Sequence, residues 1–525
     1  RVSGTVTAGT FPVLKYTGAV AGSGVFNSSV AVPQGMTGTL SNDVASSTVY
    51  VTVGGTPGIV WMGTNSVASL TNVWNISSPT NWLAAGVPAA YLETAPPGDP
   101  VLFNDLGSGV VLLSNTVSPA AVTISNNTVD YTFSGSGKVS GTTGITKQGS
   151  GTATLALSGS DYNGDTVVSG GTLKLGSATA IPDGAGKGNV SVGSTGTLDV
   201  NGFSETVNGL SGSGTINNSS TTASTLTIGG NNVSSIWSGT TVNGSGTVAL
   251  LKTGTGSLTI SGTNALGGTS QFNGGTNYLT ASGRIDPIGT GEFWVQQNAG
   301  TSTFIVNGGS LTVNSWLVIG RNNTAANGTL IVNSGTVQKG GANNLVVGSL
   351  AATGTLIVNG GQVLNNGNLW LGENTGANGT LYLNGGLVQA TQVRANGTTP
   401  TTSAAYFNGG TLQATASSTN FIQAPVIANI QSGGLVLDDG GFVLTNLTAL
   451  QEDPASTGGG LTKIGAGTVY LDGANTYTGA TLVNNGKLAG IGSISSPVTV
   501  GATGTIGAGD AETLGTLTLN SQPLS

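Results

Sequence analysis

The chain has 525 residues, of which 13 are Lys or Arg and 20 are Asp or Glu, and its net charge is −7. Charged residues make up 6% of it, against about 25% in ordinary globular proteins. The absence of cysteine and histidine excludes disulfide bonds, thiolate or imidazole metal sites, and Ser-His or Cys-His catalysis. The thinly spread acidic charge argues against a nucleic-acid partner, and we expect no cofactor.

The composition indicates many short strands joined by tight turns. Glycine accounts for 90 residues and mean hydropathy is +0.17, which distinguishes the chain from a disordered polar tail. No apolar run approaches the roughly 20 residues that span a bilayer. The first residues, RVSGTVTAGTF, do not have the pattern of a signal peptide. We expect an exported protein whose export signal has been removed or lies outside this sequence.

The N-terminal part predicts two β-rich segments, residues 1–55 and residues 56–135. The second contains a cluster of three tryptophans, Trp61, Trp74 and Trp82. We expect these indoles to form the core or cap of a local β module, because buried aromatic rings supply much of a small core. The alternative is that exposed indoles stack on sugar rings.

Three acidic residues of the same module are candidate metal ligands. Glu93, Asp99 and Asp105 offer the oxygen atoms that Ca²⁺ prefers. Their spacing matches neither an EF-hand nor the nonapeptide Ca²⁺ repeat. We expect them to cap turns, and the sequence leaves metal binding open.

A lysine-containing motif occurs twice in residues 136–290 and once in residues 421–525. Its copies read ITKQGSGTATLALSG, LLKTGTGSLTISG and LTKIGAGTVYLDG, around Lys147, Lys252 and Lys463 respectively. Each copy predicts a strand, a glycine turn and a second strand. We expect each lysine to be an edge charge at the coil surface or to bond to turn carbonyls. A ligand contact is the alternative.

Residues 291–420 contain a repeat with a period near 25, seen in STFIVNGGSL, GTLIVNSGTV, GTLIVNGGQV, GTLYLNGGLV and SAAYFNGGTL. Such a period, with short strands and no helical pattern, predicts the coils of a parallel β-helix. Leu330 and Val332 share parity, as do Leu356 and Val358, so both pairs are expected to point inward. The alternative, hairpin turns of an antiparallel sheet, does not explain the regular spacing.

One asparagine in each copy is expected to belong to a ladder along the stack. These asparagines are spaced 26, 26, 25 and 24 residues apart; they are Asn307, Asn333, Asn359, Asn384 and Asn408. We expect each to be a buried amide that bonds to turn backbone and to the asparagine one coil away. Glycine follows because the bend needs a positive φ.

Asp438 and Asp439 are adjacent carboxylates, which is the residue type that polysaccharide-cleaving β-helices use. Neighbouring residues on a strand point to opposite faces, so the two do not converge by themselves. We therefore do not expect an enzyme.

The last copy of the motif, LTKIGAGTVYLDGANTYTGATLVNNGKL, resembles the autotransporter-associated β-strand repeat of Gram-negative surface proteins. The two earlier copies match more loosely, and segments such as WNISSPTNW and VLDDGGFVLT are similar to other parts of these proteins. The resemblance implies a parallel β-helical passenger on or outside the cell, and we expect a right-handed helix. The sequence ends without a run of amphipathic barrel strands, so we expect no translocator domain within it.

The surface composition leads to a hypothesis about assembly. Residues 295 to 437 contain only four charged residues, Arg321, Lys339, Glu373 and Arg394. Low charge gives little protection against self-association. We expect subunits to join through the strand-forming ends, VSGTVTAGTFPVLKY and LGTLTLNSQPLS, into an extracellular filament or matrix. The alternatives are an adhesin or polysaccharide-binding passenger and, less favoured, a polysaccharide-degrading enzyme.

Overall fold

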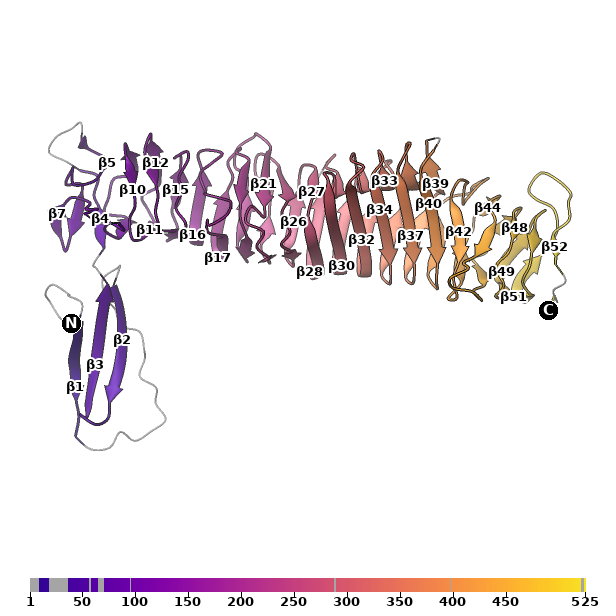
Figure 1. Ribbon diagram of the computed structural model, residues 1–525, viewed down its shortest axis with the longest axis horizontal. Coiled ribbons are helices and arrows are strands. Elements are labelled where there is room, and N and C mark those ends of the chain that lie inside the picture. The colour runs from indigo at the N-terminus through magenta and orange to yellow at the C-terminus, as the bar shows by residue number, and fades with distance from the viewer. Residues whose placement is uncertain are drawn as a thin grey trace. The chain divides into compact units, whose positions relative to one another are not determined.

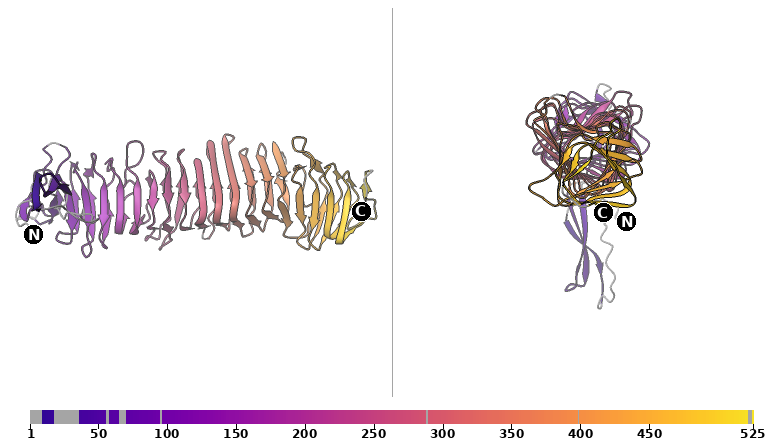
Figure 2. Two further views of the ribbon diagram at one scale, coloured as in Figure 1. Left: turned by 90° about the horizontal axis from the view of Figure 1, so that it is seen from below. Right: turned by 90° about the vertical axis from the view of Figure 1, so that its right-hand side faces the viewer.

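Parallel pairing between strands one coil apart builds the protein. The computed structural model describes residues 9–17, 36–55, 58–64, 70–94, 96–287, 289–397, 399–520 and 524–525. The chain divides into unit 1, Arg1–Asn217, and unit 2, Asn218–Ser525, and this boundary falls inside the expected segment 136–290. Each unit contains a parallel β-solenoid, whose strands follow one another in chain order in Figures 1 and 2. The predicted all-β parallel fold is thus confirmed.

The first strands of unit 1 form a small antiparallel sheet of order β1-β3-β2. Its strands are β1 (Gly9–Lys15), β2 (Met36–Asp43) and β3 (Thr48–Gly55). This sheet is the described part of the expected N-terminal β segment. Residues 1–8 and 18–35 of that segment lie outside the described residues.

The solenoid of unit 1 has two main rows of parallel strands. The first row consists of β4 (Ile59–Trp61), β8 (Val101–Asn104), β11 (Val122–Ser125), β14 (Ile145–Gln148), β16 (Thr166–Leu175) and β17 (Val190–Asp199). The second consists of β5 (Val73–Trp74), β9 (Val110–Leu113), β12 (Tyr131–Gly135), β15 (Thr152–Leu155), the second halves of β16 and β17, and β20 (Thr215–Asn217). The tryptophan segment therefore supplies the first coils of the solenoid and is not a separate module.

Short strands complete these coils. They are β6 (Trp82–Ala84) and β7 (Val87–Ala89), which pair antiparallel beside β4, with β10 (Thr116–Val117), β13 (Lys138–Val139), β18 (Glu205–Val207) and β19 (Leu210–Gly212).

Unit 2 has three main rows. The first consists of β28 (Gly275–Pro287), β30 (Gly300–Val313), β32 (Ala326–Lys339), β34 (Thr353–Val358), β37 (Asn378–Leu383), β40 (Thr402–Phe407), β42 (Ile427–Ile430) and β45 (Leu450–Glu452). The second continues from β32 through β35 (Gln362–Asn365), β38 (Leu387–Ala390), β41 (Thr411–Ala414), β43 (Leu435–Asp438), β46 (Leu461–Ile464), β49 (Thr481–Ala489) and β51 (Val498–Ile506).

The third row of unit 2 forms a separate sheet. It consists of β21 (Ser224–Ile228), β24 (Val248–Lys252), β27 (Ser270–Phe272), β29 (Phe293–Val295), β31 (Leu317–Ile319), β33 (Leu345–Ser349), β36 (Leu369–Glu373) and β39 (Val393–Asn396). Remaining short strands are β22 (Ser235–Trp237), β23 (Thr240–Thr241), β25 (Leu258–Ile260), β26 (Thr263–Leu266), β44 (Val443–Asn446), β47 (Thr468–Leu471), β48 (Ala474–Asn475), β50 (Ser493–Ile494) and β52 (Thr518–Leu519).

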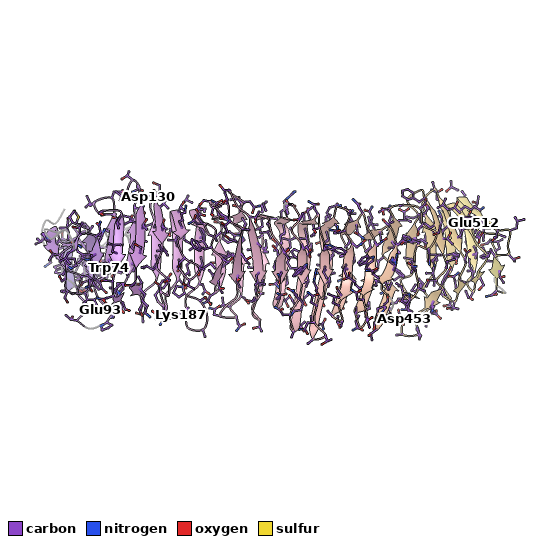
Figure 3. All side chains as sticks on the ribbon, turned by 90° about the horizontal axis from the view of Figure 1, so that it is seen from above. Trp74, Glu93, Asp130, Lys187, Asp453 and Glu512 are labelled. Atoms are coloured by element: carbon purple, nitrogen blue, oxygen red, sulfur yellow. The ribbon has the colours of Figure 1, made fainter. Side chains whose placement is uncertain are left out.

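The core follows from strand parity. Phe304, Leu330, Leu356 and Leu381 occupy equivalent places in successive coils, and each is completely buried. The expected inward parity of Leu330, Val332, Leu356 and Val358 is confirmed by their burial. Figure 3 shows the same division in unit 1, with Trp74 inside the solenoid and the exposed Asp130 at its margin. None of the described residues forms a helix with the length and hydropathy of a membrane span.

Candidate functional sites

The three tryptophans of the first coils belong to an aromatic core. Trp61, Trp74 and Trp82 are at most 1% exposed. The ring centroids of Trp61 and Trp82 are 4.9 Å apart, those of Trp74 and Trp82 are 5.4 Å apart, and Phe103 packs against all three. Buried indoles offer no face to a sugar, so the alternative of glycan contacts at these tryptophans is wrong. Edge-to-face packing of this kind stabilises a core.

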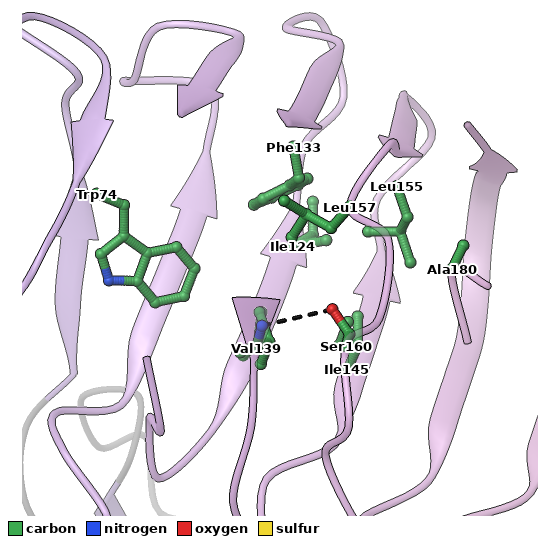
Figure 4. A pocket seen from close by; sticks show the side chains of 10 residues that line it. Trp74, Ile124, Phe133, Val139, Ile145, Leu155, Leu157, Ser160 and Ala180 are labelled. Carbon is green, nitrogen blue, oxygen red and sulfur yellow. Dashed lines mark hydrogen bonds between the residues drawn. The ribbon is translucent and has the colours of Figure 1, made fainter. Parts of the chain in front are cut away.

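A small cavity lies beside Trp74 in this core (Figure 4). Its volume is about 10 Å³, which is about the space of a single water. Phe133, Ile145 and Leu155 line it, and the backbone N–H of Val139 donates to Ser160 Oγ at 3.4 Å. The cavity is too small and too apolar for a substrate, so it carries no chemistry.

The acidic residues of the same region cap turns. Asp105 Oδ1 accepts hydrogen bonds from the backbone N–H groups of Asn127 and Thr128, both at 2.8 Å. These bonds hold the pKa of Asp105 well below its usual range. Asp99 Oδ2 accepts from Leu92 N at 2.9 Å, and Glu93 Oε2 accepts from Ser118 N at 2.8 Å. Among the residues that the structure describes, no group of three acidic side chains is placed to hold a metal ion.

The lysines of the triplicated motif are internal turn caps. Lys147, Lys252 and Lys463 are at most 1% exposed, so the expectation of an edge charge at the coil surface is wrong and the expected carbonyl bonds are present. Lys147 Nζ donates to the carbonyl oxygens of Gln148 and Gly149, both at 3.0 Å, and of Gly170 in the next coil at 3.2 Å. Each such ammonium group donates to two or more turn carbonyls inside the solenoid.

A fourth lysine, Lys339, is equally buried and donates to the carbonyl of Gly340. Burial lowers the pKa of Lys147, Lys252 and Lys339 to about 8, because desolvation disfavours the charged amine. Strand parity could have predicted this burial from the sequence. Lys339 lies two residues after the buried Val337, so its side chain points inward.

The adjacent carboxylates Asp438 and Asp439 point to opposite sides. Asp439 is completely buried and forms an ion pair with Lys463, while Asp439 Oδ1 accepts from Gly441 N at 2.7 Å. Asp438 Oδ2 lies outside the core and accepts from Gln413 Nε2 at 2.6 Å. The pair therefore does not form a two-carboxylate catalytic site.

The repeated asparagines form a hydrogen-bonded ladder over four coils. Asn333 Nδ2 donates to Asn307 Oδ1 at 2.8 Å, Asn359 to Asn333 at 2.8 Å, and Asn384 to Asn359 at 2.9 Å. These four amides are exposed, so the expectation that they are buried is wrong. Asn408 departs from the pattern, because its Oδ1 accepts from Gly433 N at 2.8 Å.

The glycine turn has a different form where the ladder stops. Gly335 and Gly361, two residues after Asn333 and Asn359, have φ of 85° and 66°. A Cβ atom on Gly361 would lie 2.5 Å from the carbonyl oxygen of Gly335 in the previous coil, so only glycine fits. After Asn408 the positive φ moves one residue earlier, to Gly409 with φ 108°.

One surface feature was missed from the sequence. A hollow of about 260 Å³, here called the outer hollow, lies over the third row of unit 2; its lining includes Glu292, Trp316, Arg321, Leu350, Glu373 and Asn374. The available signal was that Trp294 and Trp370 lie at outward positions of β29 and β36, between buried neighbours. Two of the few charges in this region lie nearby in the sequence: Arg321 comes just after β31, and Glu373 ends β36.

Sequence comparisons agree with the repeated motif. The family model of the passenger-associated transport repeat matches residues 145–175, 250–276 and 461–489. Over 198 residues the chain is 32% identical to the adhesin BmaC autotransporter of Brucella suis biovar 1 (strain 1330). This match covers 36% of the chain and 5% of that relative. The chain therefore corresponds to a small fraction of the length of the curated relative.

A search of solved structures gives no match. The matched repeats coincide with the buried lysines, since Lys147, Lys252 and Lys463 lie at the third residue of each. Each lysine therefore caps a turn inside a repeat that the family defines. The chain thus contains autotransporter passenger repeats, which together with the similarity to an autotransporter adhesin indicate a secreted, cell-surface protein of Gram-negative bacteria.

Proposed function

We propose that the chain is a non-enzymatic scaffold segment of a cell-surface adhesin. The observation that supports this most is that the charged groups that catalysis would need are bonded to other groups of the protein itself. Buried lysines bond to turn carbonyls, Asp105 caps a turn, and Asp439 pairs with Lys463. The similarity to a protein named as an adhesin adds support for the adhesive role.

Surface display tests the proposal. The chain is fused to an unrelated translocator in a non-adherent Gram-negative host, and cells attached to cultured animal cells are counted. We expect more attachment than with the translocator alone, and we expect purified chain to compete for it. Equal attachment at equal surface density would contradict the adhesive role.

A second candidate, self-assembly into a filament or matrix, is supported by an apolar stripe on the outside of unit 2. Six half-buried side chains occupy the same outward place in successive coils: Tyr278, Ile305, Ile331, Ile357, Tyr382 and Tyr406. The rings of the last two are stacked with centroids 4.9 Å apart. Exposed contiguous apolar surface with little charge around it favours association with another copy.

Electron microscopy and sedimentation at rising concentration test this second candidate. We expect the wild-type chain to form filaments or larger species, and the double variant Ile331→Lys/Ile357→Lys to remain smaller. Pairing of the terminal segments, expected from the sequence, is a separate route; residues 1–8 and 521–523 of those segments lie outside the described residues. Assembly that the double variant leaves unchanged would direct attention to that route, and a wild-type monomer at all concentrations would contradict self-assembly.

A further inference from the structure

Three stacked turns build the outer hollow. They are residues 320–322, 348–350 and 372–374, which lie at the C-terminal ends of β31, β33 and β36. The turns are tied together by backbone hydrogen bonds, including Ser349 N to Gly320 O at 3.0 Å and Leu350 N to Glu373 O at 3.0 Å. Because they rest on the parallel sheet of the third row, these turns are held by regular structure on one side.

The indole ring of Trp316 forms part of the apolar wall of the hollow. Trp316 lines it, and the centroids of Trp316 and Trp370 are 5.6 Å apart although the two residues lie two coils apart. Both rings are half-buried, unlike the tryptophans of the first coils. An indole that is packed on one side and partly open on the other provides a large rigid contact surface.

Both hydrogen-bond donors and hydrogen-bond acceptors lie beside this wall. Glu292 Oε2 accepts from Arg321 Nη1 at 3.0 Å and from Trp294 Nε1 at 2.6 Å, and Arg321 also stacks over the Trp294 ring at 4.2 Å. Glu373 Oε2 accepts from the Ser349 hydroxyl. These contacts use one oxygen of each carboxylate, so the other remains an acceptor. Arg321 Nε and Trp370 Nε1 are buried donors without an acceptor among the described residues.

The rim contains a strained leucine. Leu350 has φ 51° and is 46% exposed, whereas the equivalent places of the neighbouring coils hold Asn322 and Asn374, with φ 61° and 69°. Asparagine tolerates this left-handed region far better than leucine does. An exposed apolar side chain kept at a strained position is typical of a place where function constrains the residue.

We propose that the outer hollow binds a neutral hexopyranose unit of a polysaccharide. Trp316 and Leu350 contact the apolar face of the sugar ring, and its hydroxyl groups bond to Glu292, Glu373 and Asn374. This binding role goes beyond the scaffold function and does not depend on it. Unlike the buried tryptophans of the first coils, Trp316 lines a hollow that a ligand can enter.

The hydrogen-bond donors and acceptors of the outer hollow favour a neutral sugar over other classes of ligand. A carboxylate ligand needs donors and an ammonium ligand needs acceptors, whereas a polyhydroxylated ring uses both. The hollow offers carboxylate oxygens as acceptors and the Asn374 amide as both donor and acceptor. Two carboxylates against one guanidinium leave local negative charge, which disfavours an acidic sugar. Apolar side chains such as Trp316 and Leu350 lie beside polar and charged groups in this lining, so the hollow can contact both the ring face and the hydroxyl groups of a sugar.

Affinity electrophoresis of the full chain tests the proposal. Native gels contain dextran, mannan or galactomannan, and a polysaccharide-free gel and a polygalacturonate gel run beside them. We expect at least one neutral polysaccharide to retard the wild-type chain. Trp316→Ala and Glu373→Gln should each weaken the retardation about tenfold or more, since each removes a main contact. Leu350→Asn, which restores the residue of the neighbouring coils, should weaken it less.

Tyr470→Ala is the matched control, because it removes a half-buried aromatic ring from β47, outside the third row of the same unit. It should retain wild-type retardation. Equal circular dichroism spectra and equal mobility without polysaccharide show that each variant is folded. The proposal would be overturned if none of the three neutral polysaccharides retarded the chain, or if polygalacturonate alone did so. It would also be overturned if Trp316→Ala behaved like the wild type, or if lysine competed for binding and methyl glucoside did not.

Discussion

Lys463 and Asp439 form an ion pair whose two side chains have no exposed surface, although they lie 24 positions apart in successive coils. Lys463 Nζ also donates to the carbonyl oxygens of Gly465 and Asn485, both at 2.8 Å. The carboxylate is held in turn by the backbone N–H of Gly467 at 2.9 Å. One pair of charges thus links three coils through their turns.

Breaking this pair is expected to be costly. Asp439→Ala leaves a buried ammonium group without its counter-charge and should lower the free energy of unfolding by about 3–5 kcal/mol. The double variant Asp439→Ala/Lys463→Met removes both charges and should lose less. Urea unfolding, with hydrogen exchange of residues 435–489 as a local probe, measures both. A double variant that loses as much as the sum of the single variants would contradict the coupling.

The buried lysines predict that stability rises in mildly alkaline solution. Burial lowers the pKa of Lys147, Lys252 and Lys339 to about 8 from 10.5. Between these values the folded chain has released protons that the unfolded chain keeps, so the free energy of unfolding increases with pH. The rise should end near pH 10, where buried tyrosines such as Tyr477, with its pKa raised to about 12 by burial, act in the opposite direction.

Urea midpoints measured from pH 8 to pH 10 check this rise. Lys147→Met removes one titrating group and should reduce the slope. A flat or falling profile in the wild-type chain would show that the carbonyl bonds keep the ammonium groups charged.

Glu205 predicts the reverse slope at lower pH. Burial raises the pKa of Glu205 to about 8 from 4.5, although the backbone N–H groups of Ala180 and Ile181 oppose the shift. Between these values the folded chain keeps a proton that the unfolded chain has lost, so its stability falls as the pH rises. Urea midpoints of the wild-type chain and of Glu205→Gln should diverge in slope over this interval. Parallel slopes would exclude Glu205 as the titrating group.

The asparagine ladder predicts a graded loss of stability. Asn359 takes part in two amide–amide bonds and Asn307 in one. Asn359→Ala should lower the free energy of unfolding by about 1 kcal/mol, and Asn307→Ala by less. Asn408→Ala leaves all three ladder bonds intact and serves as the control for loss of an asparagine at the turn. Equal losses at Asn307 and Asn359 would argue against a cooperative ladder.

Much of the fold could be predicted because the same sequence pattern recurs in successive coils. The spacing of the asparagines and the parity of residues such as Leu330 and Val332 together require parallel coils. Burial of the lysines was predictable as well, since Lys463 lies two residues after the buried Leu461. The expectation failed there because a charged residue was assigned to the surface by type and not by parity. The exposed position of the asparagine amides also follows from parity, since Asn333, for example, comes directly after the inward Val332.

The outer hollow could not be predicted in the same way. Trp316 and Trp370 lie two coils apart and come together only through the way in which those coils stack. Arg321 is similar in type to any surface arginine in the sequence. Its contacts with Glu292 and Trp294 follow from the stacking of turns. Sites formed between coils can therefore be identified only from the structure, whereas the coils themselves can be predicted from the sequence.

Inward lysines also have a consequence for proteolysis. Four of the 13 Lys and Arg residues, Lys147, Lys252, Lys339 and Lys463, lie inside the solenoid, where a protease that cuts after basic residues does not reach them. From residue 295 to 437 the remaining targets are Arg321 and Arg394, and Arg321 is held by an ion pair and an indole ring. The folded chain therefore offers few places at which such a protease can begin, which suits a protein exposed to the enzymes outside the cell.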